Sequence, residues 1–193
     1  MIRILSIGLM WIATAGNLGA QNYQVTSPDQ KTRIEINTDE GLFYSVFYGN
    51  QTLLTKSPLR LSVMEEGILG DDPVVVRHYK EEVNSVIQPV VPTKSASIQD
   101  QYRQLTLECK GNYSVIFRAY NDGVAYRFET GFDGDITVES ETVQYNFGRD
   151  HKLLFAGVEG FITHQESAYE PLNISNLPED TLGLLPMVVE MPG

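Results

Sequence analysis

The chain of 193 residues carries 14 basic and 25 acidic side chains, which gives a formal charge of −11 at pH 7. Such a charge repels phosphate backbones and anionic membrane surfaces, so the composition argues against nucleic acid as a partner. The length allows one domain, two at most, and the composition is compatible with a neutral ligand such as a sugar or with a bound cation.

Residues 1–20 have the pattern of a secretory signal peptide. Arg3 gives a positive start, residues 4–15 are apolar, and small residues lead to a cleavage point after Ala20. The apolar run has about a dozen residues, whereas a spanning helix needs roughly 20, so we expect no membrane anchor. Cleavage would leave residues 21–193 as one β-sandwich domain with 13 basic and 25 acidic side chains, a charge of −12.

From there on, apolar side chains recur mostly at every second position, which is the period of β-strands. The expected strands, in chain order, are 33–37, 43–48, 52–55, 59–63, 74–76, 83–91, 105–109, 113–120, 124–130, 136–139, 143–147 and 187–190. No stretch of the mature chain has a convincing helical period, and a short helix at 168–173 would be broken by Pro171. Many short strands separated by turn residues predict an all-β, antiparallel sandwich.

The end of the chain is unusually apolar. Residues 182–190 read LGLLPMVVE, and only three residues follow them. A strand this apolar is usually central in a sheet, so we expect a chain that is cut short, with more protein downstream. The alternative is that this strand closes the sandwich.

Cys109 is the one cysteine of the chain. It alternates with Leu105 and Leu107, a pattern that indicates a small buried hydrophobe on a strand. A nucleophilic role would need a histidine partner, and no sequence feature brings one near. The domain therefore depends on its core and not on disulfides.

No motif assigns catalysis to this chain. It has no Gly-rich phosphate loop, no CxxC pair and no HExxH sequence. His78, His151 and His164 lie far apart, and we interpret each as a surface or satisfied strand residue. The acidic pairs 65–66, 71–72 and 81–82 are interpreted as solvated loops, since neighbours on a strand would point to opposite faces.

Two segments stand out from this background. Residues 117–128 predict a hairpin turning at Asn-Asp-Gly, with Phe117, Tyr126 and Phe128 on apolar faces and Arg118 and Arg127 on the polar side. Residues 163–175 are polar and aromatic without a strand period, which is typical of a functional loop. In that loop Glu166 and Glu170 can offer oxygens to Ca²⁺, but two carboxylates are too few, so other ligands would have to come from elsewhere.

These segments resemble glycoside hydrolase family 97 over residues 23–190. The most specific is 118–127, Arg-Ala-Tyr-Asn-Asp-Gly-Val-Ala-Tyr-Arg. Further similar stretches are 25–29 with Lys31, 41–46, 55–59, 169–172 (the Tyr-Glu-x-Leu element of the family) and 185–190. Asn173 departs from the family, many members of which have tyrosine there.

The resemblance implies an N-terminal β-super-sandwich of galactose-mutarotase-like fold. It implies export to the periplasm, or outside the cell, of a Gram-negative bacterium, and hydrolysis of α-glucosides or α-galactosides. The catalytic residues of the family lie in a (β/α)₈ barrel that follows this domain, so none is assigned here and the chain alone is not expected to be an enzyme. Family members hold a Ca²⁺ ion mostly with barrel glutamates and one glutamate from the N-terminal domain. By motif position that residue is Glu170, with Glu166 as the alternative.

Two other functions compete with this one. A stand-alone carbohydrate-binding sandwich would present aromatic side chains on an exposed face, and Tyr44, Tyr48 and Tyr120 are the candidates. A purely structural or adhesive sandwich would bind no ligand.

Overall fold

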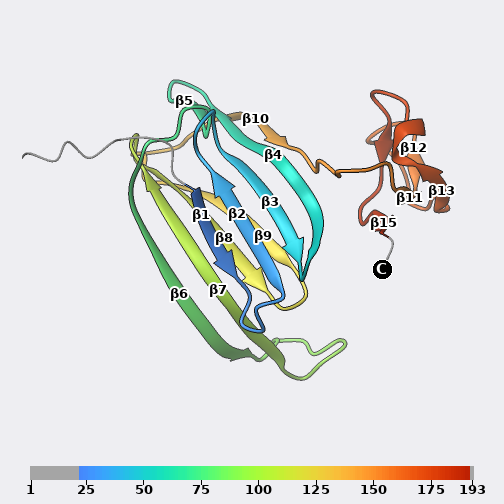
Figure 1. The fold of residues 1–193 in the computed structure, drawn as a ribbon. Coiled ribbons are helices and arrows are strands. Elements are labelled where there is room, and N and C mark those ends of the chain that lie inside the picture. The colour runs from blue at the N-terminus through green and yellow to red at the C-terminus, as the bar shows by residue number, and fades with distance from the viewer. Residues whose placement is uncertain (1–21, 192–193) are drawn as a thin grey trace, which may run out of the picture.

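A computed structural model describes residues 22–191, and the expected signal peptide lies outside this range. Two antiparallel sheets pack face to face, with a small C-terminal unit beside them (Figure 1). The first sheet has the order β1-β2-β3-β4-β10, and β5 pairs with β4. Its strands are β1 (Asn22–Thr26), β2 (Thr32–Asn37), β3 (Phe43–Tyr48), β4 (Gln51–Val63), β5 (Gly67–Leu69) and β10 (Val138–Val143).

The second sheet has the order β6-β7-β8-β9. Its strands are β6 (Val75–Ile87), β7 (Ile98–Cys109), β8 (Tyr113–Tyr120) and β9 (Val124–Thr130). Every strand pairs antiparallel with its neighbours. The expected all-β, antiparallel architecture is therefore confirmed. None of the helical segments within residues 22–191 is long and apolar enough to cross a bilayer.

The core lies between the two sheets, where alternate side chains of both meet. Ile34 and Ile36 of β2 face Leu105 and Leu107 of β7 and Phe117 of β8, all with at most 1% of their surface exposed. Cys109 belongs to the same cluster, which confirms its interpretation as a buried hydrophobe.

The expected strands 43–48 and 52–55 meet in a hairpin, and the predicted hairpin of residues 117–128 is confirmed. Tyr48 pairs with Gln51 across Gly49-Asn50, and Ala119 pairs with Val124 across the Asn-Asp-Gly turn. On the second hairpin Phe117 and Tyr126 lie opposite each other in the core, while Arg118 and Arg127 lie on the outer face.

The long strands differ from the expectation. Residues 52–55 and 59–63 belong to the single strand β4, and residues 75–76 and 83–87 of two expected strands belong to the single strand β6. Between them lie Arg77 to Glu82, which are polar on both faces and so gave no periodic signal. The pair Glu81-Glu82 is therefore on a strand and not in a loop, and its two side chains contact Gln104 and Arg103 separately.

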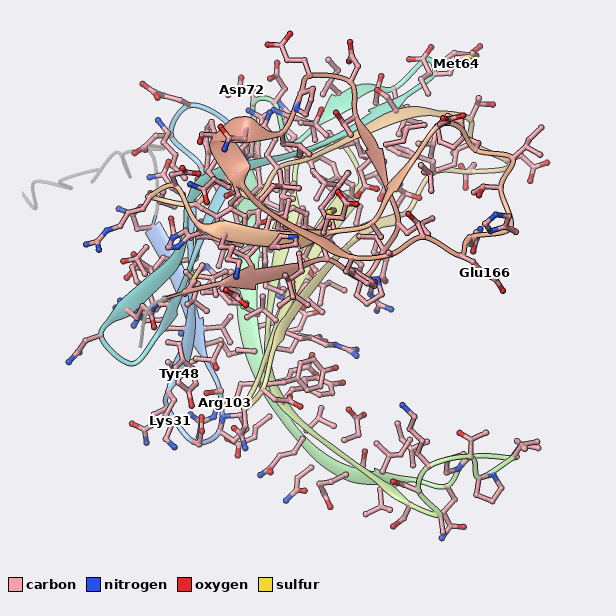
Figure 2. All side chains as sticks on the ribbon, turned by 90° about the vertical axis from the view of Figure 1, so that its right-hand side faces the viewer. Lys31, Tyr48, Met64, Asp72, Arg103 and Glu166 are labelled. Atoms are coloured by element: carbon pink, nitrogen blue, oxygen red, sulfur yellow. The ribbon has the colours of Figure 1, made fainter. Side chains whose placement is uncertain are left out.

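Beyond the core, β6 and β7 continue as a projecting hairpin, which we call the arm (residues 84–100; Figure 2). Val86, Ile87, Val90, Val91 and Ile98 are all exposed along it. Its cross-strand contacts are internal, as in the hydrogen bond from the Gln99 side-chain amide to Asn84.

The C-terminal unit consists of two small sheets, β13-β11-β15 and β12-β14. Its elements are β11 (Lys152–Phe155), β12 (Gly157–Val158), β13 (Glu170–Asn173), a 3₁₀ turn (Ile174–Asn176), β14 (Leu182–Gly183) and β15 (Val188–Glu190). The expectation of a central C-terminal strand is wrong, because β11 is the middle strand and Leu185 is 80% exposed. The expected strands 136–139 and 143–147 are replaced by β10, which spans the gap between them.

Candidate functional site

Both candidate glutamates lie in the C-terminal unit. Glu170 is the first residue of β13, where it pairs with Phe155 of β11. Phe155, Leu153 and Ala156 are buried and form a small core under these strands. A strand over this core therefore fixes the backbone of Glu170, whereas its side chain is exposed.

Asp150 anchors the far end of β13. Its carboxylate accepts hydrogen bonds from the backbone N–H of Ser175 at 3.0 Å, from the Ser175 hydroxyl at 2.8 Å and from the Asn173 amide at 3.2 Å. The Ser175 bonds, chiefly the backbone one, lower the pKa of Asp150, since they favour its charged form. Sequence reasoning missed this role, because the main partner, Ser175, lies 25 positions away.

Tyr169 anchors the near end. Its hydroxyl donates to the carbonyl of Pro186 at 2.8 Å, which ties the residue before Glu170 to the segment leading into β15. The sequence showed Tyr169 only as part of a motif, because its partner lies 17 positions away. Glu170 is thus held between two fixed points.

Glu166 lies in the loop between β12 and β13, which is shaped by local hydrogen bonds. The Glu166 N–H donates to Nδ1 of His164 at 3.0 Å, and the Ser167 hydroxyl donates to the carbonyl of Gly157 at 2.8 Å. Figure 2 shows Glu166 at the outer end of this loop, with its side chain pointing away from the strands. Phe161 and Ile162 of the same loop are 90% and 102% exposed.

The two carboxylates are chemically free to bind a cation. Within residues 22–191, neither forms a hydrogen bond or an ion pair through its side chain, and both are exposed. The described part of the chain contains no group of three or more His, Cys, Asp or Glu residues that could hold a metal ion. The donor set therefore fits one or two oxygens of a Ca²⁺ shell that needs six to eight, with the rest supplied from outside these residues.

The structure keeps the three histidines apart. His78 stacks edge-on against Tyr23 at 5.1 Å between ring centroids, and His151 stacks likewise against Phe147 at 6.0 Å. His164 accepts the Glu166 N–H in the loop. Each has a structural contact, as the sequence indicated.

The three candidate tyrosines do not form a sugar-binding surface. Tyr44 is a core residue with 5% exposure, and burial raises its pKa to about 12. Tyr120 packs on Tyr102 on the outer face of the second sheet, with 5.0 Å between ring centroids. Tyr48 alone is well exposed, at 46%, and lies at the β3–β4 turn. Tyr44 and Tyr48 share one face of β3, but Tyr44 is buried and Tyr120 lies on the other sheet, so the three candidates form no common exposed surface.

The chain is similar to known proteins over most of its length. The family model described as Glycosyl-hydrolase 97 N-terminal matches residues 25–193. A retaining alpha-galactosidase of Bacteroides thetaiotaomicron is 27% identical over 199 residues, and the alignment covers 98% of this chain and 30% of the relative.

Two solved structures share the fold. A glycoside hydrolase family 97 enzyme from Pseudoalteromonas sp. strain K8, in complex with acarbose, has a TM-score of 0.66 at 19% identity over 78% of this chain and 24% of its own. A beta-arabinopyranosidase has a TM-score of 0.68 at 23% identity over 78% of this chain and 26% of its own. The chain therefore spans less than a third of the length of each of these proteins.

Proposed function

Because the chain belongs to the glycosyl-hydrolase 97 N-terminal family, we propose that it is the N-terminal domain of an exported, calcium-dependent α-glycosidase. Its substrates would be oligosaccharides with α-linked glucose or galactose, and its place of action the periplasm or the cell exterior. The observation that carries this proposal is the match over residues 25–193 together with a relative of which the chain covers only 30%.

The division of labour follows from the chemistry of glycoside hydrolysis. Two carboxyl groups must flank the scissile bond, about 5 to 9.5 Å apart. We assign that pair to a (β/α)₈ barrel of the same polypeptide, on which this domain packs. The domain itself would pack against the barrel and help to shape the substrate pocket.

Glu170 is the residue by which this domain would enter the site. Its backbone is fixed by β11 and by the anchors at Tyr169 and Asp150, while its carboxylate has no partner among residues 22–191. Bound calcium would supply positive charge and fix carboxylates and sugar hydroxyls near the reacting bond. Glu170 would contribute one oxygen ligand and connect the sandwich to the barrel, with Glu166 as the alternative ligand.

The downstream reading frame is the first test. A (β/α)₈ pattern that begins within a few dozen residues of Gly193 is required. In the full-length enzyme, Glu170→Gln should weaken calcium binding on the order of tenfold or more and lower turnover, because a neutral amide replaces a charged ligand. Glu159→Gln, in the neighbouring loop, is the matched control, and Glu166→Gln tests the alternative. Unchanged calcium affinity and turnover in Glu170→Gln would disprove the assignment.

A stand-alone carbohydrate-binding role has one observation in its favour. A hollow of about 890 Å³ beside the β3–β4 turn is lined by the exposed Tyr48 and by Asn50, Gln51, Thr52, Arg149 and His151. An aromatic ring among amide and hydroxyl groups suits a sugar. Saturable binding of maltose or melibiose by the isolated chain, abolished by Tyr48→Ala, would favour this role.

A further inference from the structure

The second sheet ends at β9 with an open edge. Within the described residues, β9 forms backbone pairs with β8 alone, and no strand lies on its other side. Its hairpin is closed by the Tyr120 N–H, which donates to the carbonyl of Gly123 at 2.8 Å. Because hydrogen bonding alternates along an antiparallel strand, residues 125, 127 and 129 direct their backbone groups to β8. Residues 124, 126, 128 and 130 direct theirs to the open edge.

An apolar cleft lies next to this edge. Its volume is about 250 Å³, and its lining includes Tyr44, Leu54, Val124, Tyr126 and Tyr145. Val124 and Tyr145 are 37% and 61% exposed at its mouth. Open backbone groups beside an apolar cleft are what an added strand needs, since it gains main-chain hydrogen bonds and buries alternate side chains.

The first sheet extends past β9 and roofs this cleft. Tyr44 of β3 lies over Tyr126 of β9, with 6.4 Å between ring centroids. The first sheet then continues through β4 to β10, where Glu141 accepts a hydrogen bond from the Tyr126 hydroxyl at 2.8 Å. Beneath β4, the second sheet therefore lacks a strand.

We propose that the β9 edge and its cleft accept one more β-strand, antiparallel to β9, from a longer polypeptide of which this chain is the N-terminal part. The source of the strand rests on the proposed function, because the relatives are more than three times as long as the matched region. The strand carries apolar side chains at alternate positions, which fill the cleft beneath Tyr44 and Leu54.

A second copy of the chain does not fit this edge. Antiparallel pairing of two β9 strands requires a two-fold axis perpendicular to the sheet, which puts both first sheets on the same side. The roof formed by β4 and β10 would then occupy the space of the partner's first sheet. A single extended segment has no such second layer and fits.

The outer face of β9 adds a charge pattern. Arg127 and Glu129 form an ion pair at 3.0 Å, and their side chains are 60% and 59% exposed. Opposite charges directly across a pair of strands stabilise it. The incoming strand is therefore expected to place an acidic residue opposite Arg127 and a basic residue opposite Glu129.

The synthetic peptide Val-Lys-Val-Glu-Val-Thr-Val, with both ends uncharged, follows this pattern. When it pairs antiparallel with β9, its first residue lies opposite Thr130 and its last opposite Val124, so its Lys faces Glu129 and its Glu faces Arg127. Fluorescence anisotropy of the labelled peptide with the purified chain should show saturable binding, and hydrogen exchange should slow at the amides of 124, 126, 128 and 130. A peptide with Lys and Glu exchanged should bind about three- to tenfold more weakly, and the Arg127→Glu, Glu129→Lys double variant should reverse this preference. Both substituted side chains are exposed, so the variant keeps the core.

With the purified chain, three outcomes would overturn the proposal. One is that the peptide does not slow hydrogen exchange at β9. Another is that exchanging Lys and Glu in the peptide, or Arg127 and Glu129 in the chain, does not change which peptide binds more tightly. The third is a concentration-dependent dimer, by analytical ultracentrifugation, in which β9 is protected without peptide. In the longer polypeptide the same amides should be protected from the start and the peptide should not bind; exposed β9 amides there would also refute the proposal. None of these measurements involves calcium or hydrolysis, so they fail independently of the proposed function.

Discussion

At the scale of single residues, Gly70 occupies a position that a side chain cannot share. Its φ is +86°, and an added Cβ would lie 2.7 Å from the carbonyl oxygen of Leu59, a backbone atom that cannot move aside. Its carbonyl also accepts the N–H of Leu42 at 2.7 Å, which joins the β3 entrance to the end of β5.

Gly70→Ala should therefore lower the free energy of unfolding by about 1–3 kcal/mol, as measured by urea denaturation. Gly49→Ala is the matched control, because its φ is also positive, at +55°, but nothing lies within 4 Å of the added Cβ. The control should lose only about 1 kcal/mol. Equal losses in the two variants would show that the contact with Leu59 has no effect.

Asp150 predicts a local acid sensitivity. Hydrogen bonds from Ser175 hold the pKa of Asp150 below the ordinary 3.8. The contribution of the charged carboxylate to stability is therefore present above pH 3.8 and is lost as the pH falls through the lowered pKa. The amide signal of Ser175, followed by NMR, should shift as the pH falls below 3.8. In Asp150→Asn this titration should disappear, and its persistence would mean that another group causes it.

At the scale of elements, the arm should be dispensable for the fold. Residues 84–99 are exposed apart from Pro89, and their contacts lie within the arm itself. Joining Val83 to Tyr102 by an Asn-Gly turn, which suits a two-residue hairpin, should change the free energy of unfolding by about 1 kcal/mol or less. A loss of several kcal/mol in chemical denaturation would show that the arm packs on the sandwich.

The elements also show where sequence is informative. Residues 113–130 were predicted with both strand boundaries correct, because Asn-Asp-Gly is a local turn signal and the flanking residues alternate. The strand Glu170–Asn173 was not predicted, since it contains Pro171, has no alternation and exists only through pairing with Lys152–Phe155. The middle of β6, residues 77–82, was missed for a related reason: its largely polar residues show no apolar face in the sequence.

In the candidate site, too, local features could be predicted from the sequence and long-range contacts could not. Glu166 and Glu170 could be chosen from the sequence, because acidic side chains in a polar loop are visible there. Asp150 and Tyr169, which position the loop, could not, because their partners are the distant Ser175 and Pro186. Local chemistry is readable from one sequence, whereas long-range hydrogen bonds are not.

At the scale of the whole molecule, the two parts should differ in local stability. The main core joins residues from Tyr23 to Ala119, whereas the described part of the C-terminal unit, up to residue 191, buries only the apolar residues Leu153, Phe155 and Ala156. Little buried apolar area means a low free energy of local opening.

Amides of β11, β13 and β15 should therefore exchange with deuterium well before those of β7 and β8, in a native-state exchange series followed by mass spectrometry. Phe155→Ala should accelerate exchange in the C-terminal unit and leave β7 and β8 unchanged. Simultaneous exchange of both parts would show that they open as one cooperative unit.

The buried thiol of Cys109 has a practical consequence. Burial raises its pKa, so the reactive thiolate is scarce while the sandwich stays closed. Since the chain has no other cysteine, any reagent that becomes attached to a thiol must have reached this one position. The rate at which iodoacetamide alkylates Cys109 therefore reports how fast the two sheets separate, and no engineered cysteine is needed.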